Sequence, residues 1–332
     1  MLQSGVVSSR TRSVDWRTSV LHTVVLELAL AVACLASLWL ALCRKEQDMD
    51  VGIGLPNALL DVEGPELVVW AQRAEQRGFS VLGTIGRIAY GSHEELIALA
   101  GAAGATERIE LMTTVLVAPP RQAVLLAKQA ATLQAVSGGR FRLGLGIGGR
   151  DDDWLALGEE PKNKGQKLEE CIATCRSVWA GGKPGGALLP VGPKAPYLPI
   201  VLGGYSDSAF RRAGRLADAF VAGPMPPEAV AGAYEVVKAG AEQAHREAPA
   251  LYAARYVAIG HDAADETDRN ARSYYGFGGD ALVQMVQGGI LRSSDDLRET
   301  LDNLKQAGVV EVCLWPLARS IDQVDRVADA AL

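Results

Sequence analysis

One stretch decides the fold, and it reads RIELMTTVLVAPP (108–120), RQAVLLAKQAATLQAV (121–136) and SGGRFRLGLGIGGRDDD (137–153). Residues 109–117 are rich in β-branched and aliphatic side chains and stop at two prolines, which is typical of a buried strand. Residues 142–147 have the same character, so they predict a second strand.

A helix connects these two strands. Leu126, Ala130 and Leu133 fall on one face at helical spacing, and the glycines of 137–139 end the pattern. Strands joined by a helix run parallel, with a right-handed crossover, so their carboxyl ends open on the same side. Ligands bind at that side in parallel α/β folds.

The same alternation of strand and helix continues through residues 49–332. Strands are expected at 51–55, 81–85, 109–117, 142–147, 200–203, 219–222, 256–260 and 309–315. Eight strands, each followed by a helix, predict a (β/α)8 TIM barrel, for which about 250 residues are usual. A doubly wound open sheet is the alternative.

Composition limits the classes of function. The chain has 332 residues, 48% of them hydrophobic, and a net charge of −6, which disfavours a nucleic-acid partner. Its five cysteines stand at no framework spacing, which indicates a reducing compartment, and no group of ligands predicts a metal site. We therefore expect a cytoplasmic protein.

Residues 1–48 do not share the barrel pattern. Their apolar segment, 28–43, is shorter than the ~20 residues of a membrane-spanning helix, and Glu27 and His22 interrupt its extension. We interpret Met49 as the natural start and residues 1–48 as an upstream extension. Membrane anchoring through residues 20–43 is the alternative.

The glycines of residues 144–149 fit the pattern G-x-G-x-x-G. A dinucleotide site needs a helix to begin at once, whereas we expect 151–164 to be a long polar loop, with Asp151 to Asp153 solvated at the entrance. We therefore interpret Gly146, Gly148 and Gly149 as allowing close approach to a flat ligand.

Residues 203–206 end a strand and precede a helix. Gly203, Gly204 and Tyr205 would present free amides, and Ser206 would be the N-cap, a phosphate ligand, or both. An ordinary capped turn is the alternative. A position on a late loop of the barrel favours phosphate.

Few other residues have a context that predicts chemistry. Thr113 and Thr114 lie at a strand end and either face a ligand or bond the backbone in the core. Arg87 is either a catalytic residue at the mouth or a solvated loop arginine. No nucleophile–base pair supports a hydrolase, so a cofactor is expected to carry the reaction.

From Met49 onward the sequence resembles the bacterial luciferase-like flavin-dependent oxidoreductases. The resemblance rests on residues 108–120, 126–133, 137–140, 143–149, 199–220 and 308–316. It implies a luciferase-like barrel that binds reduced FMN, or the deazaflavin coenzyme F420, at the carboxyl ends of the strands.

The resemblance also implies roles for particular residues. Thr114-Val115 stands where the family often has a non-proline cis peptide beneath the flavin ring, and residues 203–206 match its phosphate loop. An acidic residue or a histidine is frequent in the family at the positions of Gly86 and Arg87. This chain departs there, and Arg87 is left to hold an anionic substrate or a flavin edge.

The implied activity is a monooxygenase that uses reduced FMN and oxygen on a small organic substrate. A deazaflavin-dependent hydride transfer and a non-catalytic flavin-binding barrel are the alternatives. A flavin reductase that supplies reduced flavin and a homodimeric state are the expected partners.

Overall fold

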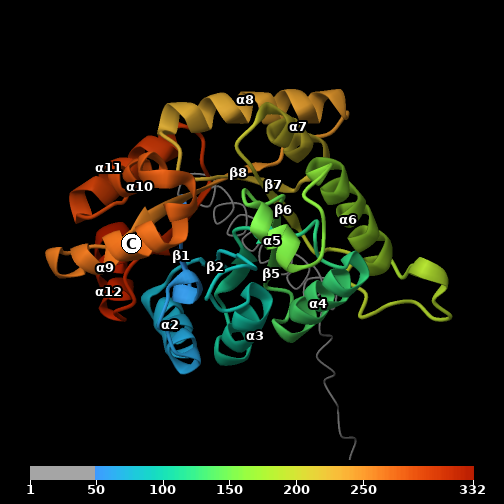
Figure 1. The fold of residues 1–332 in the computed structure, drawn as a ribbon, viewed down its shortest axis with the longest axis horizontal. Coiled ribbons are helices and arrows are strands. Elements are labelled where there is room, and N and C mark those ends of the chain that lie inside the picture. The colour runs from blue at the N-terminus through green and yellow to red at the C-terminus, as the bar shows by residue number, and fades with distance from the viewer. Residues whose placement is uncertain (1–48) are drawn as a thin grey trace, which may run out of the picture. The chain divides into compact units, whose positions relative to one another are not determined.

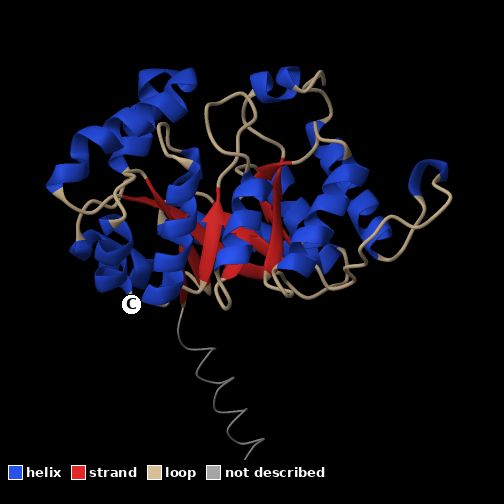
Figure 2. Ribbon diagram, turned by 90° about the horizontal axis from the view of Figure 1, so that it is seen from below, coloured by secondary structure: helices blue, strands red, loops and turns tan. Residues whose placement is uncertain are grey.

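The computed structural model describes residues 49–332, and these form a closed parallel barrel. The sheet runs in the order β3-β2-β1-β9-β8-β7-β6-β5-β4, and pairing of β3 with β5 closes it. Every neighbouring pair is parallel. Figure 1 looks along the barrel, and Figure 2 shows the strands (red) surrounded by helices (blue). The TIM barrel prediction is therefore confirmed.

The bounds of the elements follow the predicted alternation. The strands are β1 Asp50–Gly54, β2 Val81–Thr84, β3 Glu110–Thr113, β4 Leu116–Val117, β5 Phe141–Gly146, β6 Ile200–Gly203, β7 Ala219–Ala222, β8 Ala250–Val257 and β9 Glu311–Pro316. The main helices are α2 Gly64–Arg77, α3 Glu95–Ala105, α4 Ala123–Val136, α5 Asp151–Ala156, α6 Lys164–Trp179, α7 Asp207–Leu216, α8 Pro227–Gln243, α9 Ala264–Tyr275, α10 Gly279–Gly288, α11 Ser294–Gln306 and α12 Asp322–Ala331. Short 3-10 turns are η1 Pro56–Ala58, η2 Pro184–Gly186, η3 His261–Ala263 and η4 Gly276–Gly278.

The third strand of the barrel has two parts. The single strand predicted at 109–117 is β3 followed by β4, and the peptide bond between Thr114 and Val115 is cis, as the resemblance implied. Both parts pair with β5. The nine strand segments therefore form an eight-stranded barrel, in which β3 and β4 together make one strand.

Two predictions of local structure were wrong. The strand predicted at 256–260 is β8, Ala250–Val257, whose alanine-rich sequence hides a strand that is fixed by ladders to β7 and β9. The loop predicted at 151–164 begins with α5. Three aspartates in its first turn stabilise the amino end of this helix, and its Trp154 side chain is completely buried.

The interior of the barrel is layered along β9. Near the amino end, Glu311 binds the guanidinium of Arg142 at 2.8 Å. In the middle layer, a Cβ added to Gly83 would lie 2.5 Å from Cys313 Sγ, so only glycine fits. At the carboxyl end, Trp315 packs on Tyr256 with ring centroids 5.1 Å apart. The barrel is therefore filled from its amino end to the level of Trp315.

The interpretations of residues 1–48, including the start at Met49 and the apolar segment 28–43, lie outside the described residues. Among the helices of residues 49–332, none is both long enough and apolar enough to cross a membrane.

Candidate active site at the mouth of the barrel

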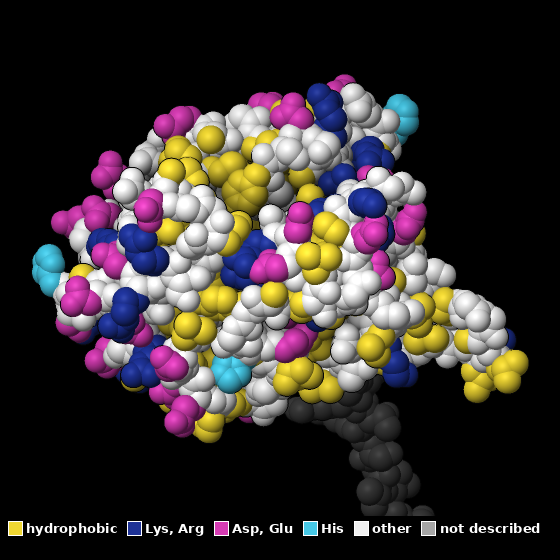
Figure 3. Space-filling view, viewed as in Figure 1, with side chains coloured by type: hydrophobic (Ala, Val, Ile, Leu, Met, Phe, Trp, Pro, Cys, Tyr) yellow, Lys and Arg dark blue, Asp and Glu magenta, His cyan; other side chains and the backbone are white. Residues whose placement is uncertain are grey.

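A cavity of about 600 Å³ opens at the carboxyl ends of the strands. Residues from the ends of β2, β4, β5, β6, β8 and β9 line it together with α10. Figure 3 views this face, where basic and acidic side chains meet near the centre. The cavity lies where the sequence placed the site.

Ten of the eleven predicted site residues line this cavity. They are Arg87, Thr114, Val115, Gly146, Gly148, Gly149, Gly203, Gly204, Tyr205 and Ser206. Their binding roles remain predictions.

Thr113 is the predicted site residue that does not line the cavity. Its hydroxyl donates to Gly144 O at 2.7 Å and accepts from Gly144 N at 2.8 Å. Thr113 is fully buried, so its side chain fixes β3 against β5. The Thr114 hydroxyl is also engaged, because it donates to Thr84 O at 3.0 Å and accepts from Trp315 Nε1 at 2.8 Å.

The glycines at the ends of β5 and β6 make room for valine side chains. A Cβ on Gly146 would lie 2.6 Å from Val115 Cγ2, and one on Gly203 would lie 3.2 Å from Val115 Cγ1. Gly148, with φ +73°, is similarly close to Val117. Only at Gly149, among these four, would a Cβ meet open space. Val115 therefore forms the floor. Of Gly146, Gly148 and Gly149, only Gly149 has open space at the Cβ position, and the close approach of a flat ligand to these three residues stays a prediction.

The turn of residues 203–206 has the predicted N-cap. Ser206 is the N-cap of α7, and its hydroxyl accepts from Ala209 N at 3.4 Å. A Cβ on Gly204 would lie 2.4 Å from Ala209 Cβ, so the turn is packed tightly against the helix. The cavity thus meets the amino end of a ten-residue helix, where free amides attract anions.

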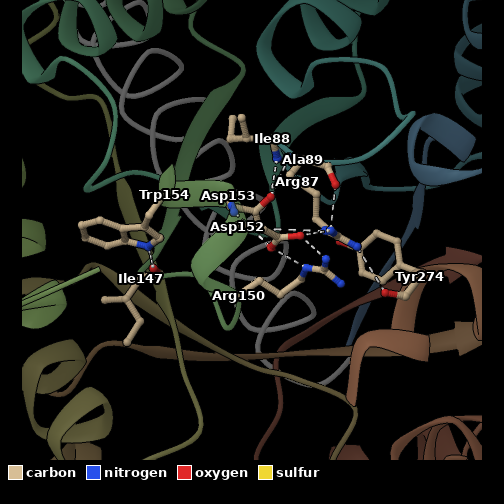
Figure 4. A network of polar contacts seen from close by, with 9 residues as sticks. All are labelled: Arg87, Ile88, Ala89, Ile147, Arg150, Asp152, Asp153, Trp154 and Tyr274. Atoms are coloured by element: carbon tan, nitrogen blue, oxygen red, sulfur yellow. Dashed lines mark hydrogen bonds and ion pairs between the residues drawn. The ribbon is translucent and has the colours of Figure 1, made fainter. Parts of the chain in front are cut away.

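Arg87 is held by a buried polar network (Figure 4). Its guanidinium lies over the rings of Tyr90 and Tyr274, at 4.8 and 5.2 Å from their centroids. It donates to Ala89 O at 3.0 Å and to Tyr274 O at 3.3 Å. The residue is 8% exposed, so the solvated-loop alternative is wrong.

Asp153 organises the same network from α5. One carboxylate oxygen accepts from Ile88 N at 2.9 Å and from Ala89 N at 2.7 Å, and the other lies 3.9 Å from Arg87 Nε. Asp153 is 2% exposed, so the prediction that residues 151–153 are all solvated was wrong for it. A buried carboxylate is retained here because two amides and a cation surround it.

The missing acid after β2 has a physical explanation. A Cβ on Gly86 would lie 1.4 Å from Oε1 of Glu95, so the carboxylate of α3 occupies the space that a side chain at position 86 would need. Glu95 is 1% exposed and bonds Arg121 at 2.9 Å through its other oxygen. Burial raises the pKa of Glu95 to about 7.

Sequence reasoning missed one side of the cavity, which we call the aromatic wall. It consists of Tyr256 from β8, Tyr274 and Tyr275 from α9, Phe277 from η4 and Trp315 from β9, with three aliphatic side chains of α10 beside them. The signal that could have found it is the sequence Tyr-Tyr-Gly-Phe at a glycine-rich helix break, in a chain with only 6% aromatic residues.

Comparisons with known proteins agree with this geometry. Residues 49–314 match the profile of the luciferase-like monooxygenase family. An uncharacterized protein of Mycobacterium tuberculosis is 32% identical over 166 residues, which are 47% of this chain and 57% of that protein. The pyrimidine monooxygenase RutA of Escherichia coli is 27% identical over 265 residues, which are 71% of this chain and 66% of RutA. The chain thus spans less than two thirds of the length of either relative.

Solved structures share the fold with cofactors of two kinds. An F420-dependent secondary alcohol dehydrogenase, in complex with an F420-acetone adduct, has a TM-score of 0.71 at 17% identity, covering 85% of this chain and 98% of that one. The oxygenating constituent of 3,6-diketocamphane monooxygenase from Pseudomonas putida, in complex with FMN, has a TM-score of 0.65 at 16% identity, covering 85% and 97%.

Proposed function

The chain belongs to the luciferase-like monooxygenase family, and from that premise we propose that it uses reduced FMN and molecular oxygen to oxygenate a small organic substrate. The observation that carries the proposal is a cavity of about 600 Å³ that joins a helix amino end to an aromatic wall. Pockets of this size hold cofactor-sized ligands.

The residues of the cavity fit a flat ring with a phosphate tail. Val115 and Thr114 present a small, closed floor, and Gly149 leaves open space beside it. Ser206 and the first amides of α7 would hold the phosphate. Bound reduced FMN would supply the electrons and the site of reaction with oxygen.

The side chains of this protein would orient the ring and exclude water. Trp315 and Tyr256 close the cavity toward the barrel axis, and α10 covers it from the side. The Arg87–Asp153 network fixes the loop after β2 against α5, which keeps the opposite wall in place. A rigid, dry site favours an orientation-dependent reaction.

Titration of the purified protein with FMN and with F420 tests the proposal. We expect saturable binding of FMN, and oxygen consumption when reduced FMN and an organic substrate are both present. Tighter binding of F420, with loss of its reduced-form absorbance upon substrate addition and no oxygen uptake, would instead support the deazaflavin alternative. Tight FMN binding without turnover would indicate a non-catalytic flavin-binding barrel.

A further inference from the structure

The aromatic wall presents no unpaired charged side chain to a ligand. The charged residues that line the cavity are Arg87, Arg150 and Asp153, and the two arginines contact one edge of the wall, Arg87 over the ring of Tyr274 at 5.2 Å and Arg150 over that of Phe277 at 4.3 Å. Arg87 lies 3.8–3.9 Å from Asp152 and Asp153, and Arg150 is paired with Asp152. Burying a charged group without a partner is costly, so this wall favours an uncharged ligand.

Two tyrosines of the wall form a pair that keeps one hydroxyl proton uncommitted. The hydroxyls of Tyr256 and Tyr275 are hydrogen-bonded to each other. Two phenols carry two protons, and their mutual bond uses one. Within residues 49–332, neither hydroxyl has a second protein partner. One O–H group of the pair is therefore available to a ligand.

The pair acts as a donor over a wide pH range. Burial raises the pKa of Tyr275 and raises that of Tyr256 further. Both phenols therefore stay protonated in neutral solution, and neither presents a negative charge to a ligand. A hydroxyl that already accepts one hydrogen bond also becomes a stronger donor to the next acceptor.

The pair lies where a substrate beside the ring would be held. Tyr256 packs on Trp315, and Trp315 donates to the hydroxyl of Thr114 on the cavity floor. Tyr275 reaches the same place from α9, so its bond joins a helix to the barrel strand β8. The free O–H group is thus fixed from both sides, close to the floor.

We propose that the aromatic wall binds an uncharged organic substrate with a carbonyl-type oxygen, and that this oxygen accepts the hydrogen bond left over by the Tyr256–Tyr275 pair. In calling the ligand a substrate, the inference rests on the proposed function. The binding preference itself depends only on the cavity.

The test compares three probes of similar size by calorimetry, without cofactor and with saturating FMN. The probes are acetophenone, ethylbenzene, which lacks the oxygen, and benzoate, which adds a charge. We expect Tyr256→Phe/Tyr275→Phe to weaken acetophenone binding at least about fivefold, the size of one buried hydrogen bond, and to leave ethylbenzene binding unchanged. Benzoate should bind the native protein at least tenfold more weakly than acetophenone.

Tyr234→Phe is the matched control, because Tyr234 on α8 donates its hydroxyl hydrogen to Pro249 O and does not line the cavity. It should change no probe affinity. Equal losses of acetophenone and ethylbenzene in the double variant would overturn the inference, as would the absence of acetophenone binding at millimolar concentration in both states.

An infrared measurement on the native protein does not depend on the folding of any variant. The carbonyl stretch of bound, carbon-13-labelled acetophenone should move to lower frequency than in a hydrocarbon solvent, because its oxygen accepts a hydrogen bond. A stretch at the hydrocarbon position would overturn the inference.

These results separate the inference from the proposed function. Acetophenone discrimination without binding of FMN or F420 would preserve the aromatic wall as a ligand site and refute the oxidoreductase. Cofactor binding without discrimination would refute the inference alone.

Discussion

The two ends of the barrel contain similar polar groups in different settings. At the amino end, Arg142 binds the buried Glu311 at 2.8 Å and the exposed Glu110 at 2.9 Å, below the filled interior. At the carboxyl end, Arg87 binds Asp153 at the edge of a cavity of about 600 Å³. The first set can only stabilise the fold, whereas the second also shapes a binding surface. Variants at the two ends should therefore separate stability from binding.

The largest expected effect is at the amino end. Arg142→Met leaves Glu311, which is 5% exposed, without its cation, and should lower the free energy of unfolding by about 3–5 kcal/mol in urea titration. Binding of FMN by the folded fraction should not change. Arg142→Met/Glu311→Gln should recover part of the loss, and weakened FMN binding at unchanged stability would break the comparison.

The pH dependence of Glu95 tests whether a residue near the carboxyl end of the barrel also contributes to the free energy of unfolding. Burial raises the pKa of Glu95 to about 7, above the ordinary 4.5. Between these two pH values, the carboxyl group is mostly protonated in the folded state and mostly ionised in the unfolded state. Stability from this group is present at low pH and is lost as pH rises from about 4.5 to about 7. Relative to Glu95→Gln, the native protein should lose on the order of 2–3 kcal/mol between pH 5 and 8.

Urea titrations at four pH values would measure this difference. Glu94→Gln is the matched control, because Glu94 is the other carboxylate that bonds Arg121, at 2.8 Å. If the two variants show the same pH dependence, the assignment to Glu95 is wrong.

Gly86→Ala sharpens the comparison at a residue of the cavity wall. Its new Cβ would lie 1.4 Å from Glu95 Oε1, so the ion pair with Arg121 must shift. We expect a loss of about 2 kcal/mol in unfolding free energy. Gly101→Ala on α3, where nothing lies within 4 Å, should instead be stabilising by about 0.5–1 kcal/mol. Equal effects at both glycines would contradict the packing.

Ser206→Asp should affect binding with little change in stability. Aspartate remains a good N-cap, but its charge would repel a phosphate, so FMN should bind at least about tenfold more weakly, or about 1.4 kcal/mol. Ser293→Asp makes the same change at the N-cap of α11, which does not line the cavity, and should leave FMN affinity unchanged. Unaltered FMN affinity in Ser206→Asp would refute the phosphate placement.

Prediction from sequence worked where a pattern is local. The β/α alternation, the Ser206 cap and the glycine-rich ends of β5 and β6 follow from spacing and from backbone preferences. It failed for β8, since Ala250 to Arg255 has little β propensity and its strand depends on neighbours distant in sequence. It also misread Asp153, because the amides that justify its burial come from residues 88 and 89.

The sequence by itself determined a parallel barrel whose glycine-rich strand ends meet at one mouth. The hydrophobic periodicity distinguishes the strands from the surrounding helices, and the helical connections make the strands run parallel. Only the tertiary structure decided what fills the space at that mouth. Val115 occupies the room left by Gly146 and Gly203, Glu95 occupies the room left by Gly86, and Tyr275 meets Tyr256. These contacts join different elements of the fold, and their energies depend on distances that no local pattern encodes.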